Sequence, residues 1–221
     1  MPLAVITGAS RGLGHALARA LHDEGWDLVL DARDGVALCE DAPAGATCLV
    51  GDVTDPAHRS EIVAVVAAHG HADLLVNNAS HLGPSPQPAL ADYPLTELRR
   101  VYEVDVIAPL ALTQDLLPYL TGIVVNISSD AAVEAYEGWG GYGSAKAALD
   151  HATAVLAKEQ PDLRLYSFDP GDMRTQMQQD AFPGEDISDR PLPETVVPAF
   201  FALLGQPSGR YRANDLQPVP A

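Results

Sequence analysis

Short apolar runs, each about as long as one β-strand, recur along this chain and alternate with stretches of helical periodicity. Within a run the apolar residues stand at successive positions rather than at every second one, which is the pattern of strands buried on both faces. The runs cover residues 3–6, 28–30, 47–50, 73–77, 122–127 and 163–168. Strand and helix repeated in this order predict an α/β fold, a doubly wound parallel sheet in three layers. No linker or internal repeat interrupts the pattern, so we expect a single domain over residues 1–221.

The segments between the runs carry the signals of helices and loops. Helices are expected over 16–24, 56–69, 95–119, 142–159 and 194–204, and loops before residue 47 and over 83–88. Pro109 should bend or break the third helix, because a proline inside a helix lacks an N–H donor. The Pro/Gly/Asp-rich segment 170–193 is interpreted as an irregular loop over a site, and 209–216 is a candidate for a last strand.

The charge balance narrows the class of partner. Thirteen Lys and Arg against thirty Asp and Glu give a net charge of −17, which repels phosphate backbones and anionic lipid. The longest near-apolar run, 196–204, is less than half of the ~20 residues that a membrane span needs. Cys39 and Cys48 are too few for a disulfide framework, and no basic leader precedes the first strand. We therefore expect a cytoplasmic protein that binds neither nucleic acid nor membrane.

A glycine-rich turn, residues 7–14, follows the first apolar run. Gly8, Gly12 and Gly14 let the backbone turn tightly and approach a pyrophosphate without a Cβ in the way. The helix that follows would present free N–H groups and its positive dipole end to the same anion. A tight strand-to-helix turn is the alternative, but the position directly after the first strand favours binding of a dinucleotide.

The spacing of this turn, TGxxxGxG, resembles that of the short-chain dehydrogenases/reductases, and five further motifs follow in that family's order over nearly the whole chain. They are Asp52-Val53, Asn77-Asn78-Ala79-Ser80, Ser128-Ser129, Tyr142-Gly143-Ser144-Ala145-Lys146 and Pro170-Gly171-Asp172-Met173-Arg174-Thr175. The resemblance implies a Rossmann fold and a nicotinamide cofactor. It also implies a small-molecule carbonyl or alcohol substrate, no metal, and a homodimer or homotetramer formed through the helices 95–119 and 142–159.

By the same resemblance, the residues that would contact the cofactor lie in these motifs and after the second strand. They are Gly8, Ser10, Arg11, Gly12, Leu13, Gly14, Arg33, Asp52, Val53, Asn78, Ala79, Tyr142, Lys146, Pro170, Gly171, Met173 and Thr175. The hydroxyl of Thr175 would reach the carboxamide of the nicotinamide.

Tyr142 and Lys146 stand four residues apart, which places both on one face of a helix. A free phenol has a pKa near ~10, and a neighbouring cation lowers it toward a useful range. Taken alone, an exposed i,i+4 pair is the commoner explanation. Ser129 stands thirteen residues before Tyr142, which is the family's spacing. The resemblance then implies that Ser129 and Tyr142 bind the carbonyl oxygen, that Tyr142 supplies the proton, and that Lys146 lowers the pKa of Tyr142 and binds the nicotinamide ribose.

Asp105 departs from the family's pattern, which has Asn in this helix within a V-N-V-like sequence. The family's Asn acts largely through its main-chain carbonyl, which holds a water next to the Lys, and Asp105 could keep that role. Its carboxylate could instead add a negative charge near Lys146 and change the proton relay. A third interpretation is that Asp105 only holds a distortion of the helix.

The residues after the second strand bear on the choice of cofactor. An acidic residue about twenty residues beyond the glycine turn would bind the ribose 2′-hydroxyl of NAD, and Asp31 could be that residue. The pair Ala32-Arg33, with Arg11 in the turn, resembles instead the NADP-type pattern, in which guanidinium groups bind the 2′-phosphate. The alternative is that both arginines are solvated surface residues that bind no phosphate. We expect NADP(H) to be favoured over NAD(H).

The substrate is expected beside Tyr142, with walls from Tyr136, Trp139, His81, Leu82 and the loop 172–192. The function predicted is that of an NADP(H)-preferring oxidoreductase. The rival is a non-catalytic dinucleotide-binding sensor or scaffold, and only Asp105 and the altered Asn-Asn-Ala-Ser motif lean toward it.

Overall fold

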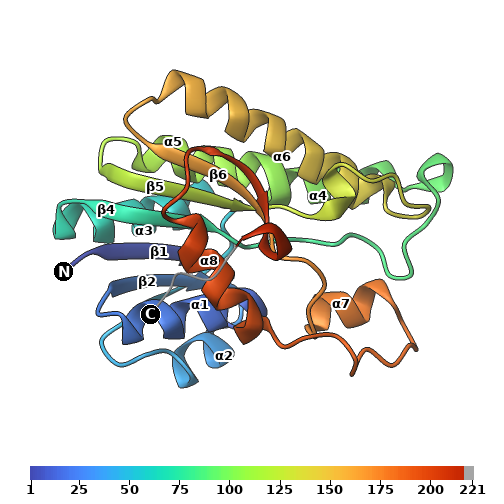
Figure 1. Cartoon of the computed structure of the whole chain (residues 1–221), viewed down its shortest axis with the longest axis horizontal. Helices are drawn as coiled ribbons and strands as arrows, with labels where there is room; N and C mark the ends of the chain where they lie inside the picture. The colour runs from blue at the N-terminus through green and yellow to red at the C-terminus, as the bar shows by residue number, and fades with distance from the viewer. Residues whose placement is uncertain (217–221) are drawn as a thin grey trace.

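Seven parallel strands form the centre of the molecule in the computed structural model, which describes residues 1–216 (Figure 1). Their order across the sheet is β3-β2-β1-β4-β5-β6-β7. The strands are β1 Leu3–Thr7, β2 Asp27–Ala32, β3 Thr47–Val50, β4 Ala72–Asn77, β5 Leu120–Ile127, β6 Arg164–Asp169 and β7 Gly209–Arg212. The chain winds outward in both directions from the neighbours β1 and β4, so the predicted doubly wound Rossmann architecture is confirmed.

Helices cover both faces of this sheet because its strands alternate apolar side chains between two cores. Ala4 and Ile6 of β1 face the core under α1 (Gly12–Asp23), α2 (Gly35–Glu40) and α8 (Val197–Leu203). Leu3 and Val5 face the opposite core, under α3 (Pro56–His69), α5 (Ala108–Leu116) and α6 (Gly140–Glu159). Figure 1 shows these two helical layers on either side of the strands. Burial of both faces explains why the strands read as continuous apolar runs. Within residues 1–216, no helix is both long and apolar enough to cross a membrane.

Local signals fix the ends of α3 as the sequence predicts. The Asp55 side chain accepts a hydrogen bond from the N–H of Ala57, and Pro56 takes the first helical position, where its missing donor has no cost. Gly70 ends the helix with φ 101°, a left-handed conformation that favours glycine.

The long helix expected over 95–119 is divided into three parts. They are α4 (Leu95–Tyr102), a π-helical turn (Glu103–Ile107) and α5, which begins at Ala108. The break therefore precedes Pro109, which lies in the first turn of α5, where a proline fits without distortion. Single π-turns inside α-helices are frequent at functional sites, and this one contains Asp105.

Two short helices were not predicted. α2 lies in the segment read as a loop before β3, and α7 (Gln176–Ala181) lies inside the excursion read as irregular. Each has a side-chain cap, from Asp34 and Thr175 respectively, but six residues are too few to show helical periodicity. α1 begins at Gly12, four residues earlier than expected, because glycines obscure its first turn. The helix expected over 194–204 is a 3₁₀ turn, Pro193–Val196, followed by α8, and the candidate last strand is confirmed as β7.

Candidate active site

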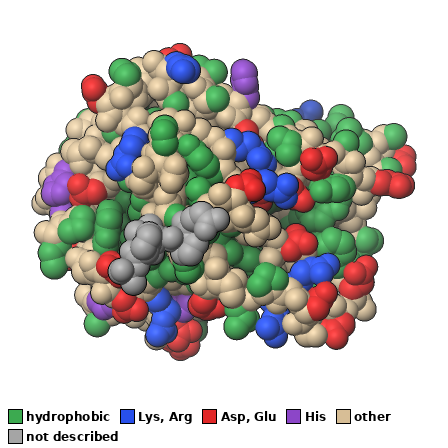
Figure 2. Space-filling model, in the orientation of Figure 1, with side chains coloured by type: hydrophobic (Ala, Val, Ile, Leu, Met, Phe, Trp, Pro, Cys, Tyr) green, Lys and Arg blue, Asp and Glu red, His purple; other side chains and the backbone are tan. Residues whose placement is uncertain are grey.

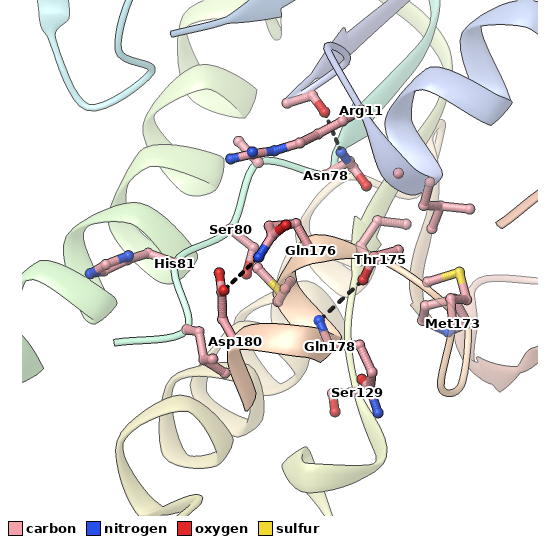
Figure 3. A pocket seen from close by; sticks show the side chains of 18 of the residues that line it. Arg11, Asn78, Ser80, His81, Ser129, Met173, Thr175, Gln176, Gln178 and Asp180 are labelled. Atoms are coloured by element: carbon pink, nitrogen blue, oxygen red, sulfur yellow. Dashed lines mark hydrogen bonds between the residues drawn. The ribbon is translucent and has the colours of Figure 1, made fainter. Parts of the chain in front are cut away.

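A cleft of about 990 Å³ opens at the carboxyl edge of the sheet. It lies where β1 and β4 diverge, which is where ligands bind in open parallel sheets. Most of the predicted site residues line it: Gly8, Ser10, Arg11, Gly12, Leu13, Arg33, Asp52, Val53, Asn78, Ala79, Ser129, Tyr142, Lys146, Pro170, Gly171, Met173 and Thr175. Figure 3 shows Arg11 and Asn78 at one end of the view, Ser129 at the other, and the segment from Met173 to Asp180 between them. Gly14 and Asp105 lie behind the wall rather than on it.

The glycine turn has the shape that close packing against the end of β4 requires. Gly8 has φ 65°, and a Cβ there would stand 2.8 Å from the Cα of Ala79. A Cβ on Gly14 would stand 2.5 Å from Asn78 Nδ2, so Gly14 serves the packing of the turn. Asn78 Nδ2 donates to the carbonyl oxygens of Thr7 (2.9 Å) and Gly8 (3.1 Å), which ties the turn to the neighbouring strand.

The start of α1 is open to an anion. Its first turn contains no acidic residue, and the side chain of Arg11, at the N-cap, makes no capping hydrogen bond. The helix therefore presents free N–H groups and its dipole to the cleft. This donor set fits the pyrophosphate of a dinucleotide.

A buried pair lies beneath the far end of the cleft. Asp31 Oδ1 is 2.5 Å from His58 Nε2, and the two side chains are 2% and 5% exposed. The imidazole lies against Gly51, where a Cβ would clash with the ring. Burial raises the pKa of Asp31 to about 6, although the bond and charge of His58 act to lower it. Asp31 Oδ1 is therefore engaged by His58, while Asp31 is also among the residues that line the cleft.

Cations surround the mouth above this pair. Arg11 and Arg33 are exposed and line the cleft. Burial raises the pKa of Asp52, but hydrogen bonds from Thr54 and the charges of Arg33 and Arg100 outweigh it, and the net pKa is lowered. Asp52 Oδ1 accepts from the N–H of Thr54 at 2.9 Å, so its side chain holds the turn after β3.

Ser129, Tyr142 and Lys146, the predicted catalytic residues, all line this cleft. Ser129 follows β5, while Tyr142 and Lys146 come from successive turns of α6 and are 7% and 2% exposed. Lys146 Nζ donates to the carbonyl oxygen of Ile127 at 2.9 Å and lies 5.4 Å from the centroid of the Tyr142 ring. Ser129 Oγ donates to Asp130 Oδ1 and accepts from the N–H of Ala131, both at 3.1 Å.

The charges at this end correct one expectation. Burial raises the pKa of Tyr142 and outweighs the attraction of Lys146, which acts in the predicted direction, so the net pKa lies above 10 rather than below. Burial also lowers the pKa of Lys146, but Tyr142 in its ionised form and the carboxylates of Asp105 and Asp150 outweigh burial and raise the pKa overall. Lys146 is therefore held as an ammonium ion.

Asp105 lies directly behind Lys146, in the π-helical turn. Its side chain is fully buried, Oδ1 accepts from the N–H of His81 at 2.9 Å, and Oδ1 is 3.9 Å from Lys146 Nζ. Burial raises the pKa of Asp105 against the attraction of Lys146. Asp105 Oδ2 meets no hydrogen-bond partner in residues 1–216. Of the roles left open by the sequence, the geometry fits both the charge beside Lys146 and the helix distortion.

Ser80 is a site residue that the sequence indicated only as a change from the family's glycine. Its hydroxyl lowers the pKa of both Asp105 and Tyr142, although its oxygen meets no partner at full hydrogen-bond geometry in the part of the chain that the structure describes. Ser80 is also among the residues that line the cleft.

The wall beside Tyr142 is apolar and aromatic. Leu82 and Tyr142 belong to one small buried cluster with Ala131, and Trp139, Met177 and Ala181 pack against this cluster. The Trp139 ring lies edge-on to Tyr142, with centroids 5.9 Å apart. His81, Leu82 and Trp139 line the cleft as predicted, and so does most of the segment 172–181. Tyr136 is not among the lining residues, because its hydroxyl donates to Asp130 Oδ2 and its side chain is 47% exposed.

Comparison with known proteins agrees with this geometry. The family model for short chain dehydrogenase matches residues 2–186. The sepiapterin reductase of Rattus norvegicus is 34% identical over 197 residues, covering 79% of this chain and 75% of that protein. The benzil reductase ((S)-benzoin forming) of Saccharomyces cerevisiae is 33% identical over 195 residues, covering 80% and 73%.

A solved structure extends the comparison to the fold. The short-chain dehydrogenase of Escherichia coli CFT073, in complex with NADPH, superposes with a TM-score of 0.88 at 25% identity and covers 96% of each chain. The match to the family model over most of the chain, together with these relatives, shows that the protein is an oxidoreductase of the short-chain dehydrogenase/reductase family.

Proposed function

We propose that the protein is an NADP(H)-dependent reductase of a carbonyl group in a small, uncharged molecule with an apolar or aromatic flank. The observation that carries this proposal is that Ser129, Tyr142 and Lys146 line the same cleft as Arg11 and Arg33. The chain would work as one domain, with the loop 172–192 over the substrate.

The residues at the glycine turn fit a dinucleotide. The free N–H groups at the start of α1 would hold the pyrophosphate. Lys146 would hold the nicotinamide ribose, and Thr175, whose methyl group lies 3.4 Å from a Cβ built on Gly12, would cover the turn. Reduced nicotinamide supplies a hydride to the carbonyl carbon when it is bound.

The choice of NADP(H) rests on three neighbouring residues. Asp31 Oδ1 is bonded to His58 and the side chain is only 2% exposed, which disfavours Asp31 as the partner of a 2′-hydroxyl. Arg33 and Arg11 are exposed at the same end and would pair with a 2′-phosphate. That a relative was solved with NADPH supports this choice.

In the proton transfer, Tyr142 would donate its phenolic proton to the carbonyl oxygen as negative charge develops there. Ser129 would turn its hydroxyl from Asp130 toward the same oxygen and donate a second hydrogen bond. Lys146, kept protonated by Asp105, would stabilise the phenolate that Tyr142 becomes after it donates its proton. The reverse reaction uses the same groups, with Tyr142 as the base.

The walls favour an uncharged substrate. Leu82, Trp139 and Met177 give an apolar surface next to Tyr142. Asp130, Asp172 and Asp180 line the same cleft, together with Arg174. Figure 2 shows acidic side chains gathered, with basic ones among them, on the side of the molecule where Figure 1 places α7. With a net charge of −17, these carboxylates disfavour a substrate that is itself an anion.

The experiment is a panel of carbonyl compounds with purified protein and NADPH or NADH. Benzil and sepiapterin come first, because two relatives are named for them. NADPH absorbance should fall with at least one uncharged aromatic ketone or diketone, faster than NADH absorbance does, and little with keto acids. A protein that binds NADPH but reduces nothing in a broad panel would be the non-catalytic sensor or scaffold instead.

The proposal includes a homo-oligomer. Leu95, Ile107 and Val155, at 61%, 47% and 41% exposure, leave apolar side chains in water on α4, the π-helical turn and α6, and a second copy would cover them. Sedimentation should give a mass of at least two chains.

A further inference from the structure

We propose that Arg210, on the last strand, is a positioning residue that holds the Ser129 backbone and the catalytic face of α6 in one fixed arrangement. This inference rests on the proposed function, because it assigns Arg210 through the groups that would carry the reaction. Arg210 belongs to none of the motifs in the sequence.

One guanidinium group contacts three elements of the site. Arg210 Nε donates to Asp150 Oδ2 on α6 at 2.8 Å, and Nη2 donates to the carbonyl oxygen of Ser129 at 2.8 Å. Nη2 also lies 3.6 Å from Asp169 Oδ2, at the end of β6. The fork of the guanidinium reaches α6 and the end of β5 at once, and an ammonium group cannot reproduce that geometry.

Each partner stands next to a group of the proposed chemistry. Asp150 is one turn beyond Lys146 and two beyond Tyr142, on the same face of α6, and its charge raises the pKa of Lys146. Asp169 precedes the Pro170-Gly171 turn and accepts from the N–H of Gly171 at 3.0 Å. Its charge raises the pKa of Tyr142. Arg210 therefore fixes the position of Ser129 and also neutralises two carboxylates that act on the other two groups.

Because the carboxylates that contact Arg210 are buried, water cannot readily take the place of its guanidinium group beside them. The side chains of Asp150 and Asp169 are 14% and 2% exposed, and Arg210 itself is 27% exposed. A carboxylate left without its partner in such a place acts on its neighbours with little screening.

Arg212 provides a matched control on the same strand. Its Nε lies 3.1 Å from Asp169 Oδ2, and its side chain is 42% exposed. Among residues 1–216 it forms no hydrogen bond to Ser129 and no ion pair with Asp150. Arg212→Gln therefore removes a cation from Asp169 and leaves the Ser129 contact in place.

The first test measures steady-state reduction of benzil by NADPH in wild type, Arg210→Gln, Arg210→Lys and Arg212→Gln. We expect kcat to fall about a hundredfold in Arg210→Gln and less in Arg210→Lys, because small displacements of reacting groups have effects of this size. The Kd for NADPH should stay within about threefold, and Arg212→Gln should keep kcat within about twofold. Equal kcat in the two glutamine variants would overturn the proposal.

The second test uses the titration of Tyr142, which a merely structural role would not move. Asp105 from the π-helical turn, Asp150 from α6 and Asp169 from β6 face the Tyr142–Lys146 pair. The tyrosinate absorbance of each variant is compared with that of the same variant carrying Tyr142→Phe, which isolates one of the seven tyrosines. Arg210→Gln should raise the Tyr142 midpoint by about half a pH unit, because Asp150 loses its cation and Asp169 keeps only Arg212.

Removal of a negative charge should shift the Tyr142 midpoint in the opposite direction. Asp150→Asn should lower the same midpoint, and the double variant Arg210→Gln/Asp150→Asn should return toward wild type. This titration needs no substrate, so it tests Arg210 even if wild type reduces no carbonyl compound and the proposed function fails. If Arg210→Gln does not fold, Arg210→Lys and Asp150→Asn carry the test. A midpoint that none of the folded variants moves would contradict the role assigned to Arg210.

Discussion

Lys146 and Asp105 lie 3.9 Å apart, Nζ to Oδ1, with side chains 2% and 0% exposed. Desolvation of the two charges offsets most of their mutual attraction, so a buried pair of this kind contributes little to the stability of the fold. Here the carboxylate raises the pKa of both Lys146 and Tyr142. The pair therefore acts on the proton chemistry that we assign to Tyr142.

Replacement of Asp105 by Asn tests this effect. The amide keeps the shape and removes the charge, so the pKa values of Tyr142 and Lys146 should both fall. The pH of half-maximal rate for alcohol oxidation should move down by about one unit, measured as kcat against pH. Asp115→Asn, an exposed acid on α5, should leave the profile unchanged. A midpoint that rises, or that stays fixed in Asp105→Asn, would count against this role.

The cofactor preference depends on Arg33. Arg33→Ser should weaken NADPH binding by about ten- to a hundredfold, because a charged hydrogen bond to a phosphate contributes about 1.5–3 kcal/mol. NADH binding should change by less than about twofold. Titration of cofactor fluorescence gives both Kd values. Arg19→Gln, an exposed cation on α1 outside the cleft, is the control. Equal weakening of NADPH and NADH would refute 2′-phosphate recognition by Arg33.

The buried Asp31 predicts a pH-dependent stability. Its pKa rises from 3.8, the ordinary value of a solvated aspartate, to about 6 in the folded chain, so the folded state binds more protons than the unfolded state between these values. The contribution of Asp31 to the free energy of unfolding is therefore fully present below about pH 4, and it is lost as the pH rises through about 6. As the pH rises from 4 to 7, the difference in free energy of unfolding between Asp31→Asn and wild type should shift by about 2 kcal/mol in favour of Asp31→Asn.

Urea unfolding of both proteins at several pH values measures that difference. Subtracting the two curves removes the contributions of the other titrating groups. A difference that stays flat over this range, or that moves in favour of wild type as the pH rises, would show that Asp31 does not have a raised pKa in the folded protein.

Gly14 should not tolerate a side chain. A Cβ at Gly14 would stand 2.5 Å from Asn78 Nδ2 and 2.6 Å from the carbonyl oxygen of Gly8. Gly14→Ala should therefore lower the free energy of unfolding by about 1–3 kcal/mol, as overpacking typically does, and weaken NADPH binding because the turn must move. Thermal unfolding and cofactor titration check both effects. Gly205→Ala, where the nearest atom lies 3.7 Å away, is the control and should change neither.

The sheet and the main site could be predicted because their signals are local in sequence. Apolar runs identify the buried strands, and the glycine turn, Ser129 and the Tyr142–Lys146 spacing each depend on a few neighbouring residues. The edge at which parallel strands end then brings these groups together without any further information.

The rest depends on contacts between distant parts of the chain. His58 meets Asp31 across 27 residues and Arg210 meets Ser129 across 81, and nothing in the local pattern around either residue indicates its partner. The raised pKa of Tyr142 follows from burial, which the spacing of Tyr142 and Lys146 does not reveal. The helices α2 and α7 are too short for periodicity to show.

The central claim is that Tyr142 transfers the proton in a reaction of bound NADPH with a carbonyl compound. Tyr142→Phe removes one oxygen and keeps the ring that packs against Trp139. Measured side by side with wild type, it should lose about a thousandfold in kcat for benzil or the best substrate found, while its Kd for NADPH stays within about threefold. A variant that binds NADPH equally well and reduces the substrate at the wild-type rate would contradict the account.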